Sequence, residues 1–146
     1  MSVIPPGWRP TRDELKQKTI LITGASDGIG KAVALACASF GAEVLLSGRN
    51  EAALERVYDD IVNAGGRTPG LIPLDLRTTQ NQPYAELAET LLGEGLAIDG
   101  LVHNAGVLGE RRALSQTSPE SWQEVLQVNI TATFLLTRAQ IGRAHV

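Results

Sequence analysis

The chain has 146 residues, of which 43% are hydrophobic and 20% are charged. This composition fits one globular domain, or part of one, with enough apolar side chains for a core. The net charge is -3 and no block of Lys and Arg is present. The sequence therefore favours small-molecule chemistry over nucleic acid or an anionic membrane as a partner.

The N-terminal segment, residues 1–17, is a Pro-rich and charged arm without the apolar stretch of a secretory signal. No apolar run in the sequence is long enough to cross a bilayer. The single cysteine, Cys37, lies among small apolar residues, a setting typical of a buried and inert thiol in a reducing compartment. We therefore expect a cytoplasmic protein.

Strand and helix patterns alternate along the chain. A β-branched apolar run at 19–23 predicts a buried strand, and apolar residues at helical spacing over 29–40 predict a helix that closes at Gly41. Further strands are expected at 43–47, 71–74 and 98–103, and further helices at 51–64, 82–92 and 119–138. The last helical stretch begins at the expected cap Ser118 and is either one long helix or two broken ones.

This alternation predicts right-handed crossovers and a parallel sheet that is covered on both faces. The expected fold is the doubly wound α/β (Rossmann) fold, incomplete here, with the strand order 3-2-1-4. In such sheets the ligand lies beyond the carboxyl ends of the strands. Functional residues are therefore expected directly after each strand, and a cluster lies at each of the four positions.

The first cluster, residues 23–30, reads Thr-Gly-Ala-Ser-Asp-Gly-Ile-Gly and joins the first predicted strand to its helix. Glycines let the backbone turn tightly and approach a pyrophosphate, and the N–H groups at the helix N-terminus supply donors. A turn that merely needs positive φ is the simpler alternative. The position between an apolar strand and a helix favours a phosphate-binding loop.

The second cluster, Ser47-Gly48-Arg49-Asn50, follows the second predicted strand. Sites for NAD commonly place an Asp or Glu here to accept the ribose hydroxyls, whereas a guanidinium can pair with the 2'-phosphate of NADP. Arg49 therefore favours NADP over NAD, with a solvated loop arginine as the alternative. Asp27 in the first cluster argues against a second basic contact to that phosphate.

The third and fourth clusters follow the later strands. Asp75, followed by Leu76, could accept a hydrogen bond from an adenine amino group, although an Asp at a strand end is as often a cap. In His103-Asn104-Ala105-Gly106, small residues let the chain pass close to a cofactor, and the Asn104 amide could fix the turn. His103 is interpreted as structural because no Cys, Asp or second His nearby completes a metal or nucleophile site, and no metal is expected.

Together, in this order and at this spacing, the four clusters resemble the classical short-chain dehydrogenases/reductases. The marks of that family are a Thr-Gly-x-x-x-Gly-x-Gly turn, an Asp after the third strand and Asn-Asn-Ala-Gly after the fourth. The resemblance covers Lys18 to about Gln140. His103 in place of the first Asn, followed by Val107-Leu108-Gly109, looks most like the bacterial YciK-like subgroup.

The resemblance implies a role for each matched position. It assigns the pyrophosphate to Gly24, Ser26, Asp27, Gly28, Ile29 and Gly30, the 2'-phosphate to Arg49, the adenine to Asp75 and Leu76, and the ribose side to Asn104, Ala105 and Gly106. Asn129, in Gln127-Val128-Asn129, matches the catalytic asparagine of the family. In the family this residue kinks a helix and positions a water in the proton relay.

A Ser, a Tyr and a Lys complete the catalytic set of the family, in which Tyr protonates the carbonyl and Lys lowers the pKa of Tyr and binds ribose. The chain carries no matching Tyr-x-x-x-Lys, because neither Tyr58 nor Tyr84 is followed by Lys four residues on. We therefore expect no turnover from this chain by itself.

The last six residues, Ile-Gly-Arg-Ala-His-Val at 141–146, interrupt the apolar helical pattern. They resemble an in-frame translation of a common sequencing-library adapter, and we interpret them as a non-native tail, with a native tail rich in substitutions as the alternative. Residues 18–140 are then the N-terminal part of a cofactor-binding domain, preceded by the arm at 1–17. Without later strands the fourth strand keeps an unpaired edge, so the chain should be poorly soluble or partly unfolded.

The sequence thus predicts an NADP(H)-dependent oxidoreductase that, as a full-length homo-oligomer, acts on a small carbonyl or alcohol. The alternative is a non-catalytic NAD(P)-binding regulatory or scaffold protein on the same fold. A third possibility, binding of FAD or another mononucleotide, is disfavoured because Arg49 and Asp75 occur together.

Overall fold

The computed structural model describes residues 7–141. The expected non-native tail lies outside the described residues from 142 onward, as do the first six residues of the arm. The elements in chain order are β1 (Thr19–Thr23), α1 (Gly28–Ser39), β2 (Glu43–Gly48), α2 (Glu51–Asn63), β3 (Gly70–Pro73), α3 (Gln82–Gly93), β4 (Gly100–Val102), the 3-10 helix η1 (Leu114–Gln116), α4 (Pro119–Leu126), the π-helical segment η2 (Gln127–Thr131) and α5 (Ala132–Ile141).

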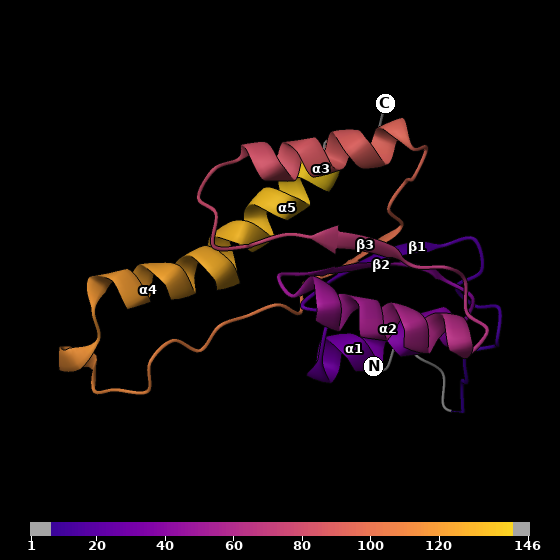
Figure 1. The fold of residues 1–146 in the computed structure, drawn as a ribbon, viewed down its shortest axis with the longest axis horizontal. Coiled ribbons are helices and arrows are strands. Elements are labelled where there is room, and N and C mark those ends of the chain that lie inside the picture. The colour runs from indigo at the N-terminus through magenta and orange to yellow at the C-terminus, as the bar shows by residue number, and fades with distance from the viewer. Residues whose placement is uncertain (1–6, 142–146) are drawn as a thin grey trace.

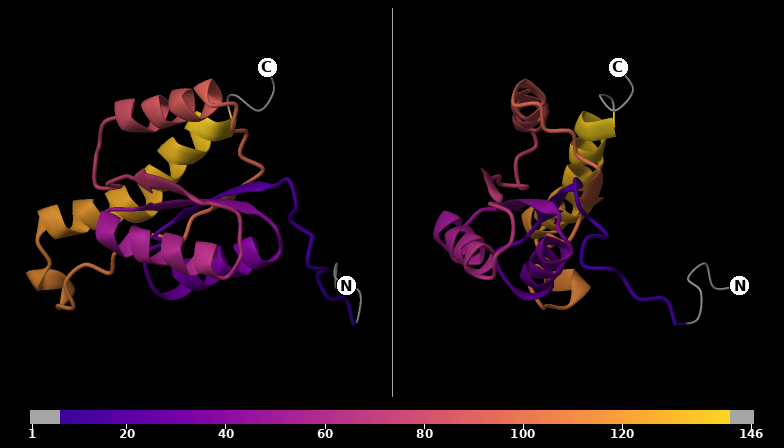
Figure 2. Two further views of the ribbon diagram at one scale, coloured as in Figure 1. Left: turned by 45° about the vertical axis from the view of Figure 1, so that its right-hand side comes forward. Right: turned by 90° about the vertical axis from the view of Figure 1, so that its right-hand side faces the viewer.

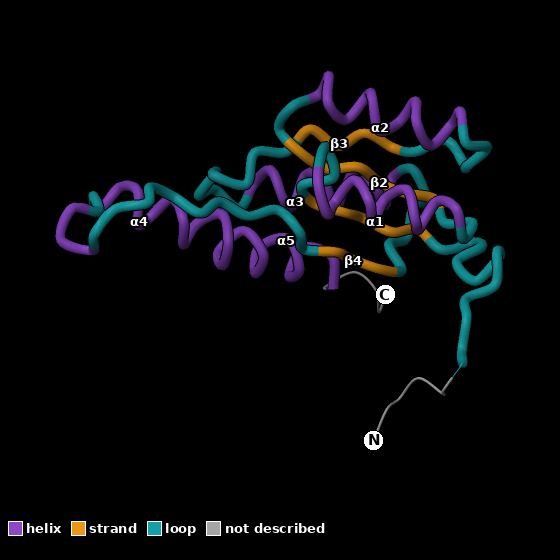
Figure 3. Tube along the Cα trace, turned by 90° about the horizontal axis from the view of Figure 1, so that it is seen from below, coloured by secondary structure: helices purple, strands orange, loops and turns teal. Residues whose placement is uncertain are grey.

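The four strands form one parallel sheet in the order β3-β2-β1-β4, which confirms the predicted fold and strand order. In the register, Ile20 of β1 is paired with Val44 of β2 on one side and with Gly100 of β4 on the other. Leu45 of β2 is paired with Gly70 of β3. Figure 3 shows the four strands side by side, with β4 at one edge.

Side chains alternate between the two faces of each strand, and each face is covered by helices. Ile20 and Ile22 of β1 belong to a buried cluster with residues of α1 and α2. Leu21, between them, points the other way and joins Leu45 in a second cluster with residues of α3 and α5. Figure 1 shows the resulting layers, with α1 and α2 on one side of the sheet and α3 and α5 on the other.

The last helical stretch is broken, as one of the two sequence interpretations expected. The Ser118 hydroxyl accepts a hydrogen bond from the N–H of Ser121 at 3.1 Å and caps α4 as predicted. The π-helical turn η2 then separates α4 from α5. A π turn holds one extra residue and marks many functional sites. In Figure 1, α4 extends past the sheet while α5 lies against α3.

The main departure from the predicted elements is β4, which spans Gly100–Val102 where a strand over 98–103 was expected. The carboxylate of Asp99 instead accepts hydrogen bonds from Thr19 N–H at 2.9 Å and from Lys18 Nζ at 2.8 Å. Ile98 therefore lies before β4, and His103 lies after it. The boundaries of the earlier elements differ from prediction by at most one residue, α5 ends at Ile141 where the helical stretch was expected to end at 138, and η1 was not predicted.

The described part of the N-terminal arm extends away from the body of the fold (Figure 2). Its last residues return to the fold, where Leu15 N–H donates to the carbonyl of Phe40 at 2.9 Å. Within residues 7–141, no helix combines the length and the apolar character that crossing a membrane requires.

Candidate functional site

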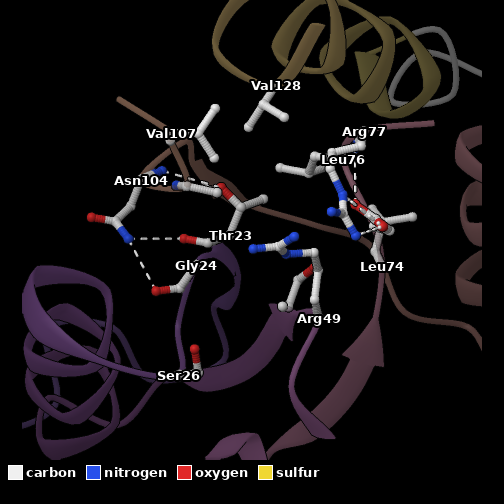
Figure 4. Close-up of a pocket in the computed structure, with 15 residues that line it drawn as sticks. Thr23, Gly24, Ser26, Arg49, Leu74, Leu76, Arg77, Asn104, Val107 and Val128 are labelled. Carbon is white, nitrogen blue, oxygen red and sulfur yellow. Dashed lines mark hydrogen bonds and ion pairs between the residues drawn. The ribbon is translucent and has the colours of Figure 1, made fainter. Parts of the chain in front are cut away.

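A cavity of about 280 Å³ lies at the carboxyl ends of the strands, where the fold predicts a ligand site. Residues at or just after the ends of all four strands line it, together with one residue of η2 (Figure 4). The lining consists of Thr23, Gly24, Ser26, Ser47, Gly48, Arg49, Leu74, Asp75, Leu76, Arg77, Asn104, Ala105, Gly106, Val107 and Val128.

The predicted site residues divide into two groups. Those that line the cavity are Gly24, Ser26, Arg49, Asp75, Leu76, Asn104, Ala105 and Gly106. Those outside its lining are Asp27, Gly28, Ile29, Gly30 and Asn129. The side chain of Ile29 is 76% exposed. Tertiary packing thus brings the four sequence clusters together at one end of the sheet.

Thr23, at the end of β1, joins the first and fourth clusters. Its side chain is 1% exposed, and its hydroxyl oxygen accepts hydrogen bonds from the N–H groups of Asn104 and Ala105, both at 3.1 Å. In return, the Asn104 amide donates to the carbonyls of Thr23 and Gly24, both at 3.1 Å. These bonds fix the backbone after β4 against the glycine loop (Figure 4). The sequence interpretation gave Thr23 no role of its own.

The glycines of the first cluster serve different purposes. Gly24 has a φ of 65°, and a Cβ there would lie 2.9 Å from the Cα of Ala105. A Cβ on Gly30 would collide with the Gly24 carbonyl and the Asn104 amide, so Gly30 serves close packing of the helix on the loop. Gly28 has a φ of 54° and no atom within 4 Å of its Cβ position. Its open side leaves room for a group such as a pyrophosphate.

Asp27 is the N-cap of α1, where its carboxylate accepts a hydrogen bond from the N–H of Gly28 at 2.7 Å. Negative charge at this end of a helix is stabilised by the helix dipole. The N–H groups of Ile29 and Gly30 belong to the first turn of the same helix. N–H groups of a first turn have no carbonyl partner within the helix. A phosphate could therefore reach these two donors beside the capping carboxylate.

Charged side chains of the cavity gather between β2 and β3. Arg49 follows β2, and Asp75 follows β3. Both carboxylate oxygens of Asp75 accept hydrogen bonds from the guanidinium of Arg77, the shortest at 2.7 Å. These bonds, with the added fields of Arg77 and Arg49, hold the pKa of Asp75 below its ordinary value. Arg77 was absent from the predicted site. The only signal for it in the sequence is that it is basic and lies two positions after Asp75.

Asn129 lies in the π-helical turn and contacts the loop after β4. Its Oδ1 accepts a hydrogen bond from Val107 N–H at 2.8 Å, and its Nδ2 donates to the Val107 carbonyl at 2.9 Å. A Cβ on Gly106 would lie 3.4 Å from Asn129 Oδ1. Asn129 is therefore adjacent to the cavity through its neighbours Val107 and Val128, both of which line it.

Gln127 is a further residue that sequence reasoning missed. Its side chain is buried, and its Nε2 donates to the carbonyl of Thr78 at 2.6 Å and to that of Leu76 at 3.4 Å. The contacts tie η2 to the loop that carries Asp75 and Leu76. The sequence offered no clear signal for this role, because its partners lie about fifty positions earlier in the chain.

His103 has a contact that fits a structural role. Its Nε2 lies 2.7 Å from the hydroxyl oxygen of Thr137 in α5, so the histidine joins the end of β4 to that helix. Desolvation lowers the pKa of His103. Among the described residues, no group of three or more His, Cys, Asp or Glu side chains is placed to hold a metal ion.

Comparison with known proteins finds the same architecture in one family. The family model described as short chain dehydrogenase matches residues 18–143. The uncharacterized oxidoreductase YciK of Escherichia coli (strain K12) is 43% identical over 132 residues, which cover 90% of this chain and 52% of YciK. The chain spans about half the length of the curated relatives it matches.

Solved structures agree with this relationship. A short chain dehydrogenase from Escherichia coli CFT073, in complex with NADPH, is 43% identical with a TM-score of 0.86, over 91% of this chain and 55% of that one. A short chain dehydrogenase from Shigella flexneri 2a, in complex with NADP, is 42% identical with a TM-score of 0.86, over 90% and 55%. The predicted family is confirmed, and the chain is a YciK-like member of the short-chain dehydrogenase family.

Proposed function

We propose that this chain is the cofactor-binding part of an NADP(H)-dependent oxidoreductase that transfers a hydride between nicotinamide and a small carbonyl or alcohol. The observation that carries the proposal is the position of Arg49, whose side chain lines the cavity directly after β2. Similar proteins were solved with NADP and with NADPH. Membership of an oxidoreductase family supports the reaction class.

Arg49 is available to an anion. Among the residues that the structure describes, the ion pairs involve lysines and other arginines, and Arg49 forms none. Figure 4 shows its guanidinium inside the cavity, between the glycine loop and the segment after β3. A guanidinium matches the geometry of a phosphate and binds it through paired hydrogen bonds. Arg49 would therefore bind the 2'-phosphate that distinguishes NADP from NAD.

The remaining residues fit the other parts of the same cofactor. We assign the pyrophosphate to the glycine loop, from Gly24 to Gly30, because Gly28 has an open side and the first turn of α1 supplies N–H donors. Asp75 and Leu76 would hold the adenine, and the turn from Asn104 to Gly106 the ribose side. When bound, the nicotinamide accepts or supplies the hydride.

The role of Asn129 in the proposal is to order the segment beside the reacting end of the cofactor. Its clasp on Val107 holds η2 against the loop after β4. The chain carries no Tyr-x-x-x-Lys. We therefore propose that these 146 residues bind NADP(H) without turnover. The same observation favours the alternative function, a non-catalytic nucleotide-binding protein, if no such pair belongs to the complete protein.

The test measures nucleotide binding to the chain and to two variants. Titration with NADPH and NADH should give tighter binding of NADPH to the unaltered chain. Arg49→Ala should weaken NADPH binding about tenfold or more and leave NADH nearly unchanged, because one charge-assisted contact is lost. Arg49→Lys, which keeps the charge, should lose less. Equal affinity of the unaltered chain for both nucleotides would contradict the proposed cofactor.

The reaction class needs a separate measurement. Oxidation of NADPH should be followed with a panel of small aldehydes and ketones, first with this chain and then with the protein translated from the source gene sequenced past the codon for Gln140. Turnover by the longer protein, with none by this chain, would support the proposed oxidoreductase activity. Nucleotide binding without turnover in both would favour the regulatory or scaffold alternative.

A further inference from the structure

The cavity carries three charged side chains, Arg49, Asp75 and Arg77, which together leave one net positive charge. Two of them form an ion pair. Arg77 and Asp75 are 2.7 Å apart at their closest atoms, and both side chains are about half exposed. The backbone N–H of Arg77 also donates to Asp75 Oδ1 at 3.0 Å, so within residues 7–141 the hydrogen bonds to this carboxylate all come from Arg77.

Asp75 is within the electrostatic reach of both arginines. Hydrogen bonding by Arg77 is the largest cause of its lowered pKa, and the field of Arg49 contributes as well. A free carboxylate in this place would attract the Arg49 guanidinium. It would also repel any phosphate that approached Arg49, and because these side chains are about half exposed, this repulsion should be modest and should depend on salt.

We propose that Arg77 is a positioning residue that determines cofactor specificity: by holding both carboxylate oxygens of Asp75, it leaves Arg49 free for a phosphate on the 2'-position of the ribose. The inference rests on the proposed binding of NADP(H). It adds that the preference for the phosphorylated nucleotide depends on two arginines, of which only one touches the phosphate.

A simpler account is that the Asp75 and Arg77 pair is a local contact between neighbours in an exposed loop, with no influence on the ligand. The chain contains a matched example of such a pair. Arg112 contacts Glu110 at 3.0 Å, also two residues apart and about half exposed, and neither residue lines the cavity. Loss of Arg112 removes the same charge and the same kind of contact away from the site.

The experiment compares the dissociation constants of NADPH and NADH for four variants by fluorescence titration at low ionic strength. Arg77→Gln should lower the ratio that favours NADPH by about fivefold, the upper range for one exposed charge pair. The double variant Asp75→Asn with Arg77→Gln should recover the preference for NADPH that the unaltered chain has, because the competing carboxylate is gone. Arg77→Lys should retain part of the preference for NADPH, and Arg112→Gln should leave that preference unchanged.

Further readouts separate this role from a purely structural one. The effect of Arg77→Gln should shrink as salt is raised to about 0.5 M, since screening weakens exposed charges. The circular dichroism spectra of all variants should match that of the unaltered chain, because the altered side chains are exposed.

Two failures are distinguishable. Suppose that the unaltered chain prefers NADPH. If Arg77→Gln keeps that preference, or weakens the binding of NADPH and NADH equally, the role of Arg77 is overturned and the proposed function stands. The role is also overturned if the double variant fails to regain the ratio. If the unaltered chain binds neither nucleotide, the proposed cofactor and the role of Arg77 fail together.

Discussion

Asn129 and Val107 are joined by a reciprocal pair of hydrogen bonds. Val107 N–H donates to Asn129 Oδ1 at 2.8 Å, and Asn129 Nδ2 donates to the Val107 carbonyl at 2.9 Å. The two residues come from the π-helical turn and from the loop after β4. A side-chain amide thus satisfies a loop backbone in the way that a neighbouring strand would, and it does so beyond β4, which ends at Val102.

Removal of this clasp should loosen the loop. Asn129→Ala should lower the free energy of unfolding by about 1 kcal/mol. The loss is modest because Asn129 is exposed, so water can replace part of the two hydrogen bonds to Val107. Hydrogen exchange of the Val107 amide should become faster. Ile130→Ala, at a neighbouring exposed position of the same turn, is the control and should cost less than about 0.5 kcal/mol. Unchanged exchange at Val107 in Asn129→Ala would contradict the clasp.

Two glycines of the loop should respond differently to the same substitution. Gly30→Ala places a Cβ against the Gly24 carbonyl and should destabilise the chain by about 2 kcal/mol or more. Gly28→Ala meets no atom within 4 Å and should cost only the strain of a positive φ, about 1 kcal/mol. Urea denaturation checks the order. Equal losses, or a larger loss for Gly28→Ala, would show that packing against Gly24 is not what Gly30 supplies.

The buried Tyr84 should make stability depend on alkaline pH. Its side chain is fully buried, and desolvation, with a smaller effect of Asp75, raises its pKa above the ordinary value of 10.0. Above pH 10 the unfolded chain loses the phenolic proton while the folded chain keeps it, so the free energy of unfolding falls as pH rises through that window. Tyr84→Phe should flatten this fall. Denaturant midpoints between pH 7 and 9, where the phenol is protonated in both states, should run parallel for the two proteins.

Much of the fold could be predicted from the sequence because its signals are local. Apolar runs such as 19–23 and the helical spacing over 29–40 identify elements without knowledge of their partners. Ser118 was recognisable as a cap for the same reason, since the N–H group it accepts from lies three residues away. The start of β4 was not predictable, because it depends on how Asp99 meets Thr19 of another strand.

The candidate site divides along the same line. The sequence by itself determined the βα alternation, the glycine loop and the presence of Arg49 after β2, since turn chemistry and periodicity act between near neighbours. Only the tertiary structure decided that Thr23 meets Asn104 across 81 positions and that Gln127 reaches the carbonyls of Leu76 and Thr78. Such contacts follow from sheet register and helix packing, which are properties of the whole fold, and no local pattern in the chain encodes them.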